Sequence, residues 1–173
     1  MMATFRHKTT SHERATPMTH VPQSEPTFVA IAATMLHRRV PTDQIARLVY
    51  LIDWKSAIED GRQATGIVWT VNDQGNLDFA PVIRELDVVR TAMRGIRSMF
   101  DMLRNLDPEA DIPEDVRAAY DHVWFVAKPM NRVDLEILVK STYPCLTALA
   151  GDPPLDLPAL AVRYAELMAV AAA

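Results

Sequence analysis

The clearest pattern in the chain is an amphipathic helix over residues 42–60. Its apolar positions recur three or four residues apart and form a stripe along the helix. In the middle of the helix this stripe is so wide that little surface is left to face water; its residues are Ile45, Leu48, Val49, Leu51, Ile52, Trp54 and Ala57. Thr42 can cap its start, and Gly61 supplies a residue that tolerates the left-handed conformation at its end. We therefore expect neighbouring elements to bury this helix at the centre of the core.

The segment that follows the helix changes to the period of a strand. Ile67, Trp69 and Val71 alternate with smaller or polar residues, which predicts a short strand over residues 66–71. Residues 72–76 are all turn formers, so the chain must reverse or redirect there.

Helical spacing recurs along the rest of the chain, with prolines marking many of its boundaries. Proline is favoured in the first turn of a helix and disfavoured in its interior. This pattern predicts helices over residues 26–39, 78–86, 113–128, 131–140 and 156–170.

Residues 87–103 fit two patterns. Apolar residues at helical spacing favour a helix slightly, while alternation on either side of Arg94 and Gly95 describes two strands. A central glycine weakens a helix and suits the turn of a hairpin. The periodicity alone leaves both structures open.

Composition indicates one domain with tails. A chain of 173 residues with 49% hydrophobic content can bury one good core but hardly two. Residues 1–24 are rich in Thr, Ser, His and Pro and predict a flexible arm. Residues 25–150 form the expected domain, and residues 151–173 a proline-containing linker and a C-terminal helix.

Charge and cysteine content narrow the class of protein. A formal net charge of -4 argues against a dedicated nucleic-acid binder, which needs a cationic face. Cys145 is the only cysteine, so no intramolecular disulfide can form. No segment approaches the roughly 20 apolar residues of a membrane helix. We expect a cytoplasmic protein with no membrane partner.

Asp53 is the most conspicuous candidate for chemistry, because it is a carboxylate inside an apolar helix. Burial raises the pKa of such a group unless a donor compensates. A structural pairing, with Arg62 or with a backbone donor, is favoured over catalysis because no second catalytic group accompanies it. The tryptophans at 54, 69 and 124 could line a pocket, but their spacing favours core positions.

Other candidate groups form no recognisable constellation. The spacing of His7, His12 and His20 fits no compact metal site. Tyr120 and His122 lie two apart on a predicted helix and so point in different directions. We expect no metal, no cofactor and no enzymatic activity.

Two separated stretches carry a family resemblance. LVYLIDWKSAIEDGRQATGIVW, together with a later STYP, is similar to the Panacea domain, also called the SocA-like antitoxin domain. Asn72 and Gly75 match the turn of that family, whereas Asn76 and Leu77 replace its Pro and Tyr. The matching residues that would define the fold are Tyr50, Asp53, Trp54, Gly61, Arg62, Gln63, Thr65, Gly66, Trp69, Ser141, Thr142, Tyr143 and Pro144.

The resemblance implies an α+β, mainly α fold: a helical bundle around a central helix with a small antiparallel β-sheet. It also implies that residues 87–103 form a β-hairpin around Gly95, and we adopt that structure. The implied function is that of an antitoxin, which neutralises a cognate toxin encoded nearby by direct contact. Some members act as adaptors that deliver the toxin to an AAA+ protease.

Partner-binding residues are then expected on the exposed hairpin. Arginine and aromatic side chains are enriched at interface centres, and the candidates are Arg90, Arg94, Arg97 and Phe100. A nucleic-acid-binding or regulatory module that uses the arginine-rich hairpin is the first alternative. The second is a small-molecule or enzymatic site around Asp53.

Overall fold

The computed structural model describes residues 25–100 and 108–172, without the side chains of residues 95–100, 108 and 110. The predicted arm, with its histidines, lies outside this part of the chain. The described elements are α1 (Pro26–His37), α2 (Thr42–Asp60), α3 (Ala80–Phe100), the short 3-10 helix η1 (Pro108–Asp111), α4 (Glu114–Ala127), α5 (Arg132–Lys140), α6 (Tyr143–Thr147) and α7 (Leu157–Ala171).

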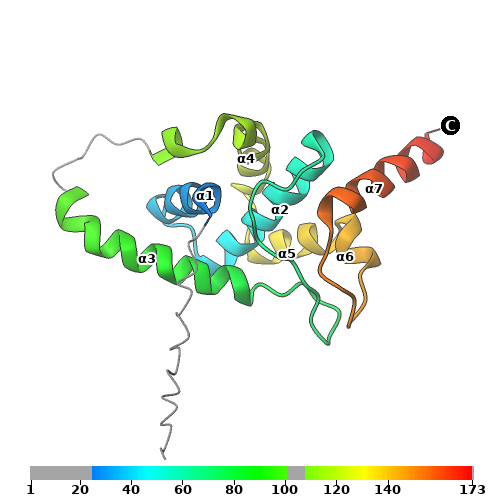
Figure 1. Cartoon of the computed structure of the whole chain (residues 1–173), viewed down its shortest axis with the longest axis horizontal. Helices are drawn as coiled ribbons and strands as arrows, with labels where there is room; N and C mark the ends of the chain where they lie inside the picture. Colours follow the sequence, from blue (N-terminus) through cyan, green and yellow to red (C-terminus); the bar gives the residue numbers. More distant parts are fainter. Residues whose placement is uncertain (1–24, 101–107, 173) are drawn as a thin grey trace, which may run out of the picture.

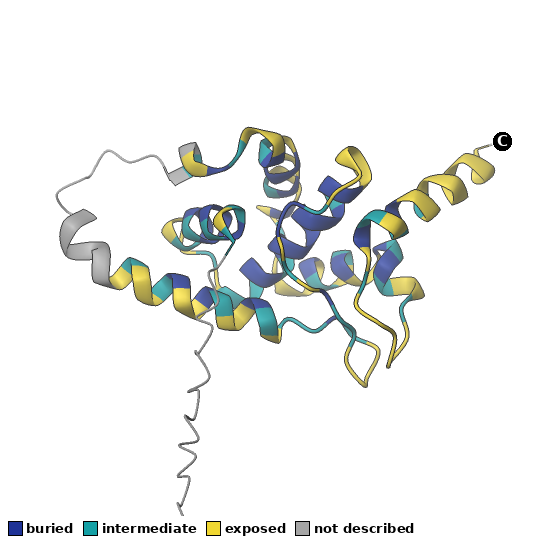
Figure 2. Cartoon of the chain, in the orientation of Figure 1, coloured by how far each residue is buried: buried dark blue, intermediate teal, exposed yellow. Residues whose placement is uncertain are grey.

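Helix α2 is the centre of the molecule (Figure 1). Helices α1, α3, α4, α5 and α7 all pack against it, and Figure 2 shows it buried along most of its length. Ile45, Val49 and Ile52 are completely inaccessible to solvent. Its apolar stripe has partners on every side, which confirms the expected central helix.

The predicted β-sheet and hairpin are wrong. The described residues contain no β-strand, and residues 87–100, with the proposed hairpin turn at Gly95, continue one helix that begins at Ala80. The inner face of α3 explains this outcome, because Val82, Leu86 and Val89 are buried at helical spacing. A glycine costs a helix only about 1 kcal/mol relative to alanine, so Gly95 does not overcome this packing.

The segment predicted as a strand is extended but has no strand to pair with. Val71 forms a single isolated antiparallel bridge with Leu77 across the turn of residues 72–76. The carbonyl of Trp69 accepts a hydrogen bond of 2.8 Å from the amide of Leu155. The alternation therefore reflects burial on one side only, with Trp69 inside and Val68 outside.

Helix α7 packs against the body through its first half only. The carboxylate of Asp156 caps its first turn by accepting from the amide of Ala159, and Leu157 and Ala161 are buried. From residue 165 to residue 172 every side chain is exposed. This half extends away from the domain in Figures 1 and 2, on the side opposite the outer half of α3.

No helix in residues 25–100 or 108–172 combines the length and the apolar character that crossing a membrane requires.

Replacing Trp54 by alanine should lower the free energy of unfolding by about 3–5 kcal/mol. Its side chain is 7% exposed, and its ring contacts Tyr164 edge-to-face with 5.8 Å between centroids. The control is Ile58→Ala on the same helix, where a side chain that is 42% exposed should cost about 1 kcal/mol or less. Equal losses for the two variants in urea denaturation would contradict this account of the core.

Candidate functional site

Asp53 lies at the point where α2 meets the extended segment, and its carboxylate is fully buried. Its Oδ1 accepts a hydrogen bond of 2.7 Å from the amide of Thr65. Its Oδ2 accepts from the hydroxyl of Thr65 at 2.7 Å and from the indole Nε1 of Trp69 at 2.8 Å. These three contacts, which we call the Asp53 clasp, fasten the extended segment to the central helix.

Burial and hydrogen bonding have opposite effects on the pKa of Asp53. Burial raises the pKa of Asp53 to about 7, although the hydrogen bonds from Thr65 and Trp69 lower it. Glu25, at the start of α1, raises it further by repulsion. Asp53 is thus paired with donors, as expected, whereas Arg62 instead forms an exposed ion pair with Asp115 at 2.5 Å.

The loop between α2 and the clasp has its own local support. Gly61 ends α2 in the left-handed conformation, with φ of 67°. The side-chain amide of Gln63 donates to the carbonyls of Thr65 and Ile67, at 2.7 and 2.6 Å. These contacts turn the chain back along α2, so that Thr65 reaches Asp53.

A second polar contact joins the two stretches that carry the family resemblance. The hydroxyls of Tyr50 and Thr142 lie 2.7 Å apart and are buried. The thiol of Cys145 lies 3.4 Å from the Tyr50 oxygen, and burial is the main cause of the raised pKa of that tyrosine. A tyrosine whose pKa is raised stays protonated, so this cluster acts as a hydrogen-bonded support.

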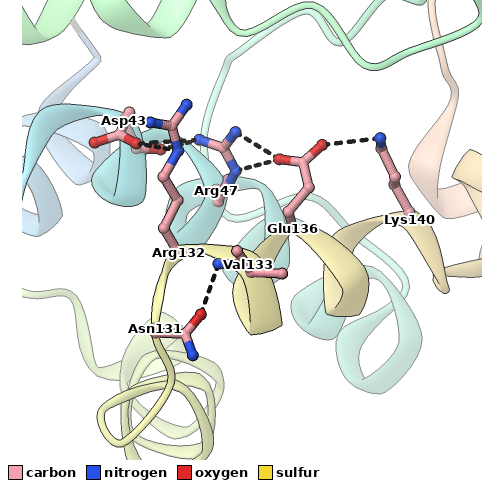
Figure 3. Close-up of polar contacts among 7 residues, drawn as sticks. All are labelled: Asp43, Arg47, Asn131, Arg132, Val133, Glu136 and Lys140. Carbon is pink, nitrogen blue, oxygen red and sulfur yellow. Dashed lines mark hydrogen bonds and ion pairs between the residues drawn. The ribbon is translucent and has the colours of Figure 1, made fainter.

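Charged residues form a network between α2 and α5 that the sequence reasoning missed (Figure 3). The guanidinium of Arg47 pairs with Glu136 at 2.5 Å and donates to the carbonyl of Asp43 at 2.6 Å. Arg132 pairs with Asp43 at 3.2 Å, and Lys140 pairs with Glu136 at the same distance. The spacing of Glu136 and Lys140 could have indicated the pair within α5, but nothing local indicates Arg47.

A groove of about 400 Å³ opens beside Trp54, between α2, α4 and α7. Its lining is largely apolar, with Lys55 and His122 among its polar groups. His122 is exposed and Tyr120 is buried, so the two do point apart, as expected. No group of three or more metal-binding side chains occurs in the described residues.

Of the four residues expected to bind a partner, Arg90 and Arg94 have side chains in the described part of the chain. Arg90 is half-buried, and its guanidinium donates to the hydroxyl of Thr42 and pairs with Asp87. Arg94 is exposed on α3. The side chains of Arg97 and Phe100 lie outside the described residues.

Comparisons with protein families, with curated proteins and with solved structures find no match to this chain. The resemblance to the Panacea domain therefore stays a prediction.

The hydroxyl of Thr65 should account for a measurable part of the stability of the clasp. Thr65→Val removes a donor to a buried carboxylate and should lower the free energy of unfolding by about 1.5–3 kcal/mol. Thr65→Ser keeps the hydroxyl and should cost about 1 kcal/mol, for one lost methyl group. A valine variant as stable as the serine variant, in urea denaturation at pH 8, would show that the hydroxyl bond contributes nothing.

Proposed function

We propose that this chain is an antitoxin-like binding protein that neutralises a cognate toxin by direct contact and carries out no chemistry itself. The observation that carries this proposal is that Panacea-like motif residues lie inside the fold and form hydrogen bonds with one another. Asp53, Thr65 and Trp69 are buried and bonded to one another, and Tyr50 is bonded to Thr142. Motif residues engaged in this way support a scaffold whose exposed faces meet the partner.

The outer face of α3 is the surface that we assign to the toxin. Arg84, Val88 and Thr91 recur at helical spacing on that face and are exposed, while the opposite face is buried against α1 and α2. The beginning of α3 also borders a groove of about 420 Å³, which the extended segment lines with Gly66 and Val68. The side chain of Val68 is 61% exposed.

The chemistry of this surface suits a protein better than a nucleic acid. Val68 and Val88 offer apolar contact, and arginine is enriched in protein interfaces. Asp87 and Glu85 interrupt the positive charge along α3, and the whole chain carries a net charge of -4. A phosphate backbone would be repelled by these carboxylates. The partner in this proposal is a small toxin encoded nearby, and the two proteins meet in the cytoplasm.

Co-expression with the adjacent gene tests the function. The neighbouring product should arrest growth when it is expressed alone and should be harmless together with this chain, and the two should co-purify. A neighbour that is harmless alone would refute the antitoxin function. Protection without a complex would refute neutralisation by contact.

Substitutions on α3 test the surface. Val88→Asp and Arg84→Glu should each weaken the complex by about tenfold or more, because each puts a negative charge in place of an apolar or a positive side chain of the contact surface. Lys128→Glu, an exposed charge reversal at the end of α4, is the matched control and should bind normally. If rescue and affinity survive both α3 variants with melting temperatures unchanged, the toxin binds elsewhere.

A further inference from the structure

Helix α7 carries an exposed face with a self-complementary pattern. Ala159, Arg163, Glu166 and Val170 follow one another at spacings of four, three and four residues. This is the spacing of a seam along which one helix packs against another. All four side chains are exposed, although α7 already uses its opposite side, with Leu157 and Ala161, to pack against the domain. The seam is therefore a second packing face, and no segment within residues 25–100 or 108–172 covers it.

The apolar residues beside the seam reinforce this conclusion. Val162 and Leu167 flank it and are 60% and 53% exposed, and Val170 within it is 77% exposed. A helix that is apolar on nearly every side is normally buried by neighbours. The only charged side chains within α7 are Arg163 and Glu166. Neither forms an ion pair with any residue in the described part of the chain.

We propose that this seam binds the same seam of a second copy of the chain, with the two α7 helices antiparallel. A two-fold axis that passes between residues 164 and 165 places Arg163 opposite Glu166 of the second copy and, by symmetry, Glu166 opposite its Arg163. The same axis places Ala159 opposite Val170. A two-fold interface requires such a self-complementary patch, and one helix supplies both the opposite charges and the apolar pairs.

A groove next to the seam gives the second helix a place to lie. The groove has a volume of about 290 Å³ and lies between α6, α7 and the residues that join them; Tyr143, Pro154, Leu155, Ala159 and Arg163 are among its lining. In the antiparallel arrangement Val170 of the second copy meets the small side chain of Ala159 at the edge of this groove. Glu166 of the second copy meets Arg163, which lines the same groove.

The size of the contact predicts how tightly the copies associate. Twelve residues of helix extend for about 18 Å, so two paired helices with the adjoining groove form an interface at the low end of the range for specific complexes. We expect a dimer that forms in the micromolar range and dissociates on dilution. It requires no other protein, so its test is independent of the proposed antitoxin function.

Sedimentation velocity of the full chain between roughly 1 and 300 µM tests the dimer. The wild type should shift with concentration from a mass of 19.4 kDa toward twice that value. Arg163→Glu and Glu166→Arg each place like charges opposite one another, and each should weaken association by at least about tenfold. Lys128→Glu, on α4, should associate like the wild type.

Two combinations of these substitutions make the test specific for the proposed pairing. The double variant R163E/E166R restores opposite charges across the axis and should dimerise again. An equimolar mixture of the two single variants should form a heterodimer, because one chain then carries two acidic and the other two basic side chains at positions 163 and 166. Circular dichroism at about 1 µM or below, where the monomer predominates, should show the same helix content and melting temperature for every variant, since both positions are exposed.

Three results would overturn the proposal. The first is a wild type that remains monomeric over the whole concentration range. The second is a pair of single variants that associate as strongly as Lys128→Glu, because the seam would then not be the contact. The third is a double variant and a mixture that both stay monomeric, because Arg163 and Glu166 would then not face each other.

Discussion

The structure depends on one buried carboxylate. Asp53 accepts three hydrogen bonds from Thr65 and Trp69 in a place that water does not reach, and it thereby ties the extended segment to the central helix. The donors offset part of the cost of burying the charge. Because Trp69 is held in this way, its ring can pack edge-to-face against Tyr50 and Phe79, with centroids 5.2 and 6.2 Å away.

The residues that stabilise the fold are separate from the surfaces that we propose bind partners. The clasp and the Tyr50–Thr142 pair lie inside, and the Arg47 network fixes α5 against α2 at the surface of the same core. The outer faces of α3 and α7 take no part in these contacts, and the two helices lie toward opposite ends of the domain (Figure 1). A toxin on α3 and a second copy on α7 could therefore bind at the same time.

The sequence predicted most reliably what depends on local pattern. The position of α2, its end at Gly61 and the burial of Trp54 all follow from spacing and turn chemistry. The hairpin prediction was wrong because the resemblance was preferred over the helical spacing of residues 87–103. In the structure Val89 continues the buried helical face that Val82 and Leu86 begin. Contacts between distant segments, such as Arg47 with Glu136, leave no local signal, so the sequence could not indicate them.

The most direct test of the clasp is the indole N–H resonance of Trp69 in ¹H–¹⁵N NMR spectra. If Asp53 holds this indole in a dry interior, the proton should exchange slowly with solvent, and its chemical shift should titrate with a midpoint near the Asp53 pKa of about 7. The half-buried Trp124 serves as an internal comparison. A Trp69 indole that exchanges at least as fast as that of Trp124, with no titration, would contradict the account.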